Sequence, residues 1–398
     1  MNRHLLSPPE DKGCETMNLS ASPILFLLIS LSGMSLSLLG AMLPEISLSY
    51  NLTGTQTSSL PLAQFLGEFC GLILLGLLLS RPRFVLCAGA LALATGALSI
   101  GLIDSFSSVM KAAFFLYGTG AGVLATLPGM IASRLAPERA ARTMTLLYAF
   151  FSAGVMASPL IAGATLSLLP SYHSIFIGFG GLVYTSALIT IIARLPCPDL
   201  GIGLALRSVK ELLSNDPSLF IVVALMNLCY VAAETVPNAY VPKYLCETFV
   251  NTTIFHGGVV LSLFWGAMTL GRIACSALLN RGVSPRLILG TLAVFSSACL
   301  LLAALMDKRI AAEALFIASG LFLSGMFPII ISYSGRLASS SSSAMFILVM
   351  AAGMLGASMA GKAVGVLADK ISFAAGMTLA VPLALLVLAF SPFLPRHT

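Results

Sequence analysis

The sequence predicts an all-α membrane protein in which twelve transmembrane helices form two bundles of six. Three observations support this fold class. Of the 398 residues, 58% are apolar and only 9% are charged, whereas a soluble domain carries about 25% charged residues. The apolar residues fall into twelve long runs, and the two halves of the chain repeat the same pattern. A surface with so little charge must face lipid, so the bilayer is the first expected partner.

Each apolar run is long enough to cross the hydrocarbon core as a helix, which takes about 20 residues. The runs are continuous rather than alternating, which excludes membrane-spanning β-strands. The first half is expected to span at about 22–43, 57–79, 84–103, 109–133, 143–169 and 174–193. The second half is expected to span at about 218–242, 254–279, 285–306, 312–333, 345–367 and 373–394.

The positions of Lys and Arg predict the orientation of these spans. With the N-terminus inside, 14 of the 21 basic residues lie at the inner side and five at the outer side, while Arg272 and Lys362 lie within spans. Basic residues favour cytoplasmic loops, so we expect both termini in the cytoplasm and the protein in the inner or plasma membrane. The same rule accounts for the net charge of +6, and nucleic acid is not expected as a partner.

Composition divides the chain into four segments. Residues 1–20 are polar and lack the apolar centre of a signal peptide, so they predict a disordered cytoplasmic tail. Residues 194–217 hold six charged residues and predict a cytoplasmic linker. Between and after these, 21–193 is the expected N-terminal six-helix bundle and 218–398 the C-terminal bundle with a short tail.

Matching residues recur in the two halves at a separation of about 200 residues, as expected for two parallel repeats related by an axis along the membrane normal. They are the pairs Pro44 and Pro242, Pro82 and Pro285, Pro128 and Pro328, and Gly154 and Gly353.

The second half contains a segment that resembles the signature of the major facilitator superfamily. Gly271-Arg272, Asn280-Arg281-Gly282 and Pro285-Arg286 make a basic, glycine-containing connection between paired spans. In that superfamily this connection locks the two bundles together at the inner side. The resemblance therefore implies gating roles for Arg272 and Arg281. The first-half copy, residues 80–83 (SRPR), lacks the usual Asp, so the implication does not extend to it.

Within that superfamily the chain is most similar to the fucose-permease-like sugar transporters. Residues 230–234 (YVAAE) resemble their YVGxE segment, and residues 325–328 (GMFP) resemble the GxxFP element of their tenth helix. Residues 142–154 resemble their inner loop and fifth helix, with Tyr148 where His or Gln is usual. The resemblance implies a sugar-like solute, with Tyr148 as a binding residue. Proton-coupled members also carry acids in helices 1 and 4, but the matching residues 124–128 (LATLP) contain none.

Span 7 carries a polar stripe that predicts a binding surface. Asn227, Tyr230, Glu234 and Asn238 fall at i, i+3, i+7 and i+11 and therefore share one helical face. In an apolar helix such a face is expected to line a cavity and to bind the substrate. The alternative is that these side chains form hydrogen bonds to neighbouring helices.

Ionisable side chains inside spans are functional candidates, because each costs about 2.5–3.5 kcal/mol at the membrane centre. Gln64 and Glu68 share a face of span 2, where Gln64 is a candidate substrate ligand. Glu68 either takes part in transport or is a buried packing residue beside the glycines of that span. We also expect Glu234 and Lys362 to form a charge pair, with Glu234, Lys362 and Glu68 as candidates for coupling.

These features together predict a secondary active transporter of a small polar solute, sugar-like by resemblance, that works by alternating access. Sugar symport with protons is one option, and a drug or metabolite exporter by proton antiport is the alternative. A transporter-like sensor or a membrane enzyme is less well supported, because no catalytic motif, metal site or cofactor motif is found. The expected partners are the small-molecule substrate, protons and lipid, and we expect a monomer.

Overall fold

In the computed structural model, the chain is described at residues 22–135, 140–169, 171–193, 195, 197–198, 200, 217–334 and 342–394. The expected tail at 1–20 and most of the expected linker at 194–217 lie outside these residues. Within them, twelve helices are long and apolar enough to cross a membrane. The predicted fold class is confirmed.

The first six spans occupy residues 22–192. They are built from α1 (Ser22–Ser49), α2 (Gly54–Thr57) with α3 (Ser59–Leu77), α4 (Pro82–Leu102), α5 (Ser108–Leu135), α6 (Ala140–Leu168) and α7 (Tyr172–Ile192). The short helix α2 was not expected, and it lengthens the second span to Gly54–Leu77. Thr53 begins it with a capping box to Gln56.

The second six spans occupy residues 217–393. They are built from α9 (Pro217–Thr248), α10 (Ile254–Asn280), α11 (Pro285–Leu305), α12 (Arg309–Leu323) with α13 (Met326–Ser334), α14 (Ser342–Lys370), and α15 (Phe373–Met377) with α16 (Ala380–Phe390) and η2 (Ser391–Phe393).

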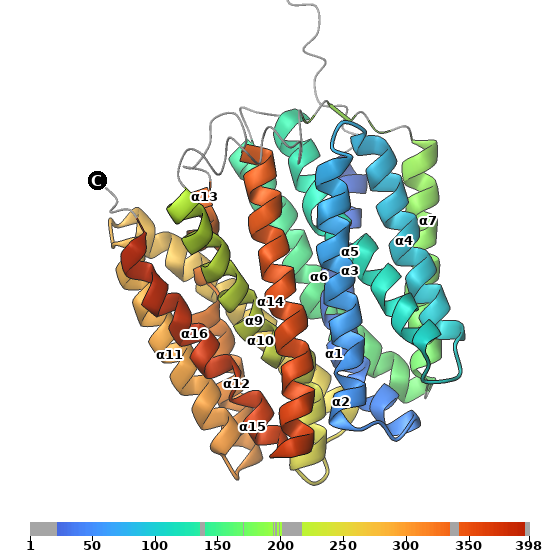
Figure 1. Ribbon diagram of the computed structural model, residues 1–398. Helices are drawn as coiled ribbons and strands as arrows, with labels where there is room; N and C mark the ends of the chain where they lie inside the picture. Colours follow the sequence, from blue (N-terminus) through green and yellow to red (C-terminus); the bar gives the residue numbers. More distant parts are fainter. Residues whose placement is uncertain are drawn as a thin grey trace, which may run out of the picture.

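The helices form two bundles that lie side by side, α1–α7 in one and α9–η2 in the other (Figure 1). We call the end of the molecule where α7 ends and α9 begins the linker end, at the top of Figure 1. The opposite end, which carries α2 and α15, is called the α2 end. The bundles pack against each other mainly through five helix pairs, which are α1 with α9, α1 with α10, α2 with α14, α3 with α14 and α6 with α10.

The contacts that join the bundles lie in the middle of the molecule and toward the α2 end. A Cβ added to Gly40 of α1 would lie 2.2 Å from the Asn238 carbonyl oxygen of α9, and one added to Gly365 would lie 2.2 Å from the Gly54 carbonyl oxygen. Ser262 of α10 donates a hydrogen bond to the Met156 carbonyl of α6 at 2.8 Å. The backbones therefore meet directly at this end.

Two sequence features set the local shape of the helices around the centre. A Cβ on Gly67 of α3 would lie 2.0 Å from the Phe115 carbonyl oxygen, so this glycine allows α3 and α5 to pack backbone to backbone. The tenth span breaks between α12 and α13 because Pro328 has no N–H to donate to the Ser324 carbonyl. The break places Phe327 and Pro328 at the central cavity.

Candidate functional site

A cavity of about 440 Å³ lies between the two bundles. That volume falls within the range of small-molecule sites, about 300–1,000 Å³. Both bundles contribute to its walls, with α1, α3, α5 and α6 from the first and α9, α10, α13 and α14 from the second. The site is therefore shared between the two repeats.

The cavity extends from the middle of the molecule toward the linker end. Met144 lies near the start of α6, Ser332 near the end of α13 and Phe346 near the start of α14, and all three line it. On the opposite side, the backbone contacts between the bundles separate it from the α2 end. Among the described residues, these contacts close the cavity at the α2 end.

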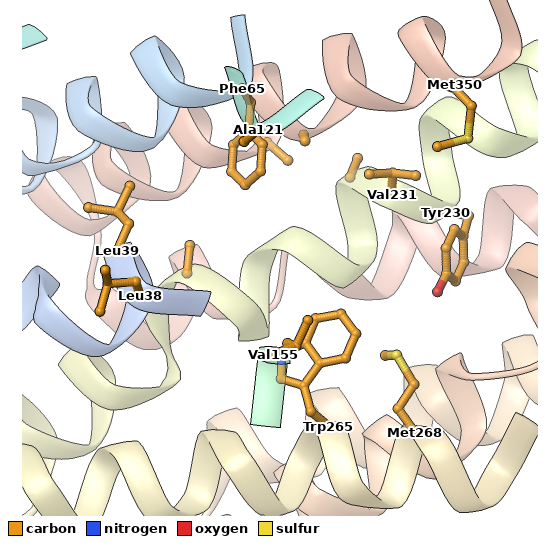
Figure 2. Packing of buried hydrophobic residues seen from close by; sticks show 14 of the residues in the cluster. Leu38, Leu39, Phe65, Ala121, Val155, Tyr230, Val231, Trp265, Met268 and Met350 are labelled. Atoms are coloured by element: carbon orange, nitrogen blue, oxygen red, sulfur yellow. The ribbon is translucent and has the colours of Figure 1, made fainter. Parts of the chain in front are cut away.

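Most of the cavity wall is apolar and much of it is aromatic. Figure 2 shows Phe65 of α3, Trp265 of α10 and Met350 of α14 pointing from three helices toward the space between them. The aromatic lining residues are Phe65, Tyr148, Phe151, Trp265, Phe327 and Phe346, and the methionines are Met144, Met350 and Met354. Such a wall suits a solute with a large apolar part.

Glu68 is the acidic group of the first bundle's wall. Its side chain lines the cavity while the residue is only 5% exposed. Gln64, one turn earlier in α3, donates a hydrogen bond from Nε2 to Glu68 Oε1 at 3.0 Å. Among the described residues no Lys or Arg forms an ion pair with this carboxyl group. Gln64 is fully buried behind Glu68 and does not line the cavity.

Glu234 and Arg272 are the charged groups of the second bundle's wall. Glu234 interacts electrostatically with the Arg272 guanidinium and with Tyr230, and Arg272 also interacts with Tyr148. Arg272 Nη1 donates a hydrogen bond to Ser152 Oγ of α6 at 3.2 Å, which joins the two bundles. Its Nε is buried and has no hydrogen-bond partner in the described structure.

Asn238 and Trp265 form the floor of the cavity toward the α2 end. Trp265 Nε1 donates to Asn238 Oδ1 at 2.9 Å, and Asn238 Nδ2 donates to the Leu36 carbonyl of α1 at 3.3 Å. Both side chains line the cavity. A side chain at the solute site therefore holds the contact between α9 and α1.

The polar stripe of span 7 is divided by the structure. Glu234 and Asn238 line the cavity, whereas Asn227 and Tyr230 are buried behind it. Asn227 Nδ2 donates to the Val349 carbonyl of α14 at 2.7 Å, and the Tyr230 ring packs on Phe327 with centroids 6.0 Å apart. Asn227 therefore fits the alternative interpretation of the stripe, in which its side chain bonds to a neighbouring helix. Arg281 is exposed at the end of α10 and does not line the cavity.

The expected charge pair between Glu234 and Lys362 is not formed, and this expectation is corrected. Lys362 Nζ donates to the Thr55 carbonyl at 2.7 Å, so it lies at the α2 end and not at the cavity. Asp369, about two turns further along the same face of α14, accepts from the Gly54 N–H at 2.6 Å and from the Thr55 N–H at 2.7 Å. We call this set of contacts, Lys362 and Asp369 on the backbone of residues 54–55, the α2 clasp.

Sequence reasoning did not single out Asp369 or the floor role of Trp265. Asp369 lies at the end of a span, where an acidic residue looks like an ordinary loop charge. A second contact between the bundles, Lys243 with Ser47, was equally hidden, because it depends on which residues of the other bundle lie opposite.

The fold and the shared cavity define a membrane transporter built from two repeated six-helix bundles, rather than an enzyme. The chain belongs to the major facilitator superfamily, whose family model matches residues 25–361. Among curated proteins, the TsgA homolog of Erwinia tasmaniensis is 25% identical over 290 residues, covering 70% of each chain.

Solved transporter structures share this fold over nearly the whole chain. The fucose:proton symporter FucP of E. coli aligns with a TM-score of 0.67 and 17% identity, over 96% of this chain and 100% of that one. A bacterial homolog of the human lysosomal transporter Spinster, in an inward-facing and occupied conformation, aligns with a TM-score of 0.74 and 13% identity, over 96% of this chain and 99% of that one. A D-xylose-proton symporter aligns with a TM-score of 0.72 and 13% identity, over 96% of this chain and 99% of that one.

Proposed function

We propose that this protein is a secondary active transporter that moves a small organic solute by alternating access, and that its linker end faces the cytoplasm. The observation that carries the proposal is the cavity, which both bundles line and which contacts between the bundles close at the α2 end. A site at the interface of two repeats can be exposed to either side when the bundles rock against each other. With the linker end inside, as the basic residues suggest, the cavity faces inward.

Protons are the proposed coupling ion. Glu68 and Glu234 place two carboxyl groups at the cavity, and a carboxyl group can take up a proton on one side and release it on the other. The first and fourth spans supply no acid at the cavity, so these two residues are the candidates within its wall. Lys362 belongs to the α2 clasp. We therefore propose that it helps to close the α2 end and does not bind the coupling proton.

Two solute classes have support. The resemblance to fucose-permease-like transporters and the similarity in fold to a fucose and a xylose symporter support a sugar-like solute. The apolar and aromatic wall supports the second candidate, a drug-like or metabolite solute exported by proton antiport. The wall is the more direct observation, because it belongs to this chain.

The test follows the distance between the bundles at both ends while solutes are added. Spin labels at Val109 and Ile310, both exposed near the α2 end of different bundles, report opening there. Labels at Phe84 and Leu287, also exposed, report the linker end. A solute that raises the melting temperature in a screen of sugars, nucleosides, amino acids, organic anions and organic cations binds the native state.

Such a solute should lengthen the first distance and shorten the second in part of the population. If a bound solute changes neither distance, alternating access is the wrong mechanism for this protein.

A further inference from the structure

We propose that the solute is an organic cation with an apolar body, and that Glu68 is the group that neutralises its charge. This inference rests on the proposed function and names its substrate class. Three features of the cavity support it, namely its hydrogen-bonding groups, its apolar surface and its charges.

The serine, threonine, asparagine and tryptophan groups of the wall already donate hydrogen bonds within the protein. Ser32 donates to the Ala121 carbonyl at 3.0 Å and Thr235 to the Val231 carbonyl at 2.7 Å. Ser35 and Ser332 donate to backbone carbonyls in the same way, and Asn238 is engaged at both ends. A solute covered with hydroxyl groups would find few free donors among these groups, and a buried acceptor that stays unpaired costs about 1–3 kcal/mol.

The apolar surface suits a body that carries positive charge. A cation over an aromatic face gains about 0.5–2 kcal/mol from the ring's electrons, and the cavity offers six aromatic side chains. Three methionines complete the wall, and their flexible thioethers adapt to irregular shapes. The wall therefore favours an apolar cation and does not require one fixed shape.

Among the described residues, Glu68 is the acidic group of the cavity wall that has no cationic neighbour. Glu234 has the guanidinium of Arg272 as an electrostatic neighbour in the same bundle, so a positive charge of the protein already lies near it. In the part of the chain that the structure describes, the hydrogen-bond partner of Glu68 is the Gln64 amide. The other titratable group beside it is Tyr117 of α5, whose hydroxyl donates to the Ser35 carbonyl at 3.0 Å. An organic cation would supply the missing positive charge.

The same carboxyl group can hold either a proton or the cation. When the cation binds, the Glu68 O–H bond breaks, the proton leaves to solvent, and the carboxylate electron pair remains on Glu68 opposite the cation. Because both ligands require this one group, each reduces the affinity for the other, which is the reciprocity expected of linked binding. Exchange of an organic cation for a proton follows from that competition.

The experiment compares three probes with one phenylpropyl body and different head groups: 3-phenylpropyltrimethylammonium, 3-phenylpropanol and 3-phenylpropionate. Binding to the purified full chain is measured by calorimetry at several pH values. The cation should bind about tenfold more tightly than the alcohol, and its affinity should rise with pH as protons leave Glu68. Equal or tighter binding of the alcohol or the anion would overturn the proposal.

Variants assign the effect to a residue. Glu68→Gln keeps the shape of the side chain and should remove the advantage of the cation, about tenfold, together with its pH dependence, while the alcohol binds as before. Glu45→Gln alters a carboxyl group of α1 that does not line the cavity, and it should change nothing. If Glu234→Gln abolishes the preference and Glu68→Gln leaves it intact, Glu68 is the wrong residue. Should Glu68→Gln fail to fold, the probe series on the unaltered chain still decides the charge preference.

The same measurements separate this inference from the proposed function. If a sugar or another screened solute moves the spin labels and the cation does not bind, only the organic-cation inference fails. If the cation binds and no solute moves the labels, alternating access fails and the charge preference stands.

Discussion

Removing the Asp369 side chain should open the α2 end. Asp369 of the second bundle accepts two backbone hydrogen bonds from Gly54 and Thr55 of the first, at 2.6 and 2.7 Å. Asp369→Ala deletes both bonds and leaves Lys362 as the remaining side chain of the α2 clasp. When the bundles separate at this end, the two N–H groups can bond to water, so the substitution weakens the closed state alone.

The size of the effect follows from the two bonds. A net hydrogen bond contributes about 0.5–1.5 kcal/mol, and more when one partner is charged. Asp369 is exposed to solvent, which reduces the benefit of its charge. We therefore assign about 1–2 kcal/mol to the pair of bonds, which corresponds to about a fivefold to thirtyfold shift of the population toward the open state.

Spin labels at Val109 and Ile310 measure that population directly. Asp104→Ala is the matched control, because Asp104 is an exposed acid of the first bundle whose neighbour His173, 3.6 Å away, belongs to the same bundle. It should leave the distance distribution unchanged. If Asp369→Ala and Asp104→Ala give the same distribution as the unaltered chain, the α2 clasp does not hold this end closed and the reasoning is refuted.

Four further outcomes are expected. Single cysteines at 134–142 and 194–217 in a Cys-less variant should label only from the cytoplasm, and those near 51 and 251 only from outside; labelling of both sets from one side would contradict the orientation. Arg272→Ala should reduce transport by shifting the balance of states, with solute affinity changed less than about threefold, because its bond to Ser152 joins the bundles; unchanged distances with lost binding would make it a solute ligand. Gly40→Val should open the α2 end, since an added Cβ meets the Asn238 carbonyl, whereas Gly178→Val, with open space around it, should not; equal distances in both variants would refute this. Burial raises the pKa of the Cys197 thiol to about 11, and the neighbouring Cys87 raises it further while Arg83 lowers it. Maleimide should therefore label this thiol slowly at pH 7, and about tenfold faster for each pH unit above that. Fast labelling at pH 7 would contradict the raised pKa, because it would mean an accessible thiolate.

The fold could be predicted because its causes are local and repeated. Twelve apolar runs specify helices in a bilayer whatever their neighbours are, and only the ends of the spans shifted. The break at Pro328 was not predicted, although the sequence analysis singled out the GMFP segment as a resemblance and a missing N–H acts wherever the helix lies. The short helix α2 was missed because four residues carry too weak a pattern.

The candidate site could be predicted only in part, because helical spacing gives a face but not the neighbour that the face meets. The stripe from Asn227 to Asn238 extends about 16 Å along the helix, and its two ends meet different surroundings. Asn227 meets the backbone of α14, while Glu234 and Asn238 meet the cavity. Lys362 was expected to pair with Glu234 because both lie within spans, but a sequence says nothing of how two helices are rotated toward each other. Its ammonium group faces the Thr55 carbonyl instead.

The direct meeting of backbones at the α2 end also bears on electrical insulation. Moving one elementary charge across a membrane potential of 100 mV releases about 2.3 kcal/mol, so any continuous file of water through a carrier would discharge the gradient that drives it. At Gly40 and at Gly365 a carbonyl oxygen of the opposite bundle occupies the space where a side chain would begin, which leaves no width for a water molecule at those points. Larger residues there would hold the bundles apart and open a path for ions. The small residues at this seam thus keep the membrane sealed while the cavity is exposed on the other side.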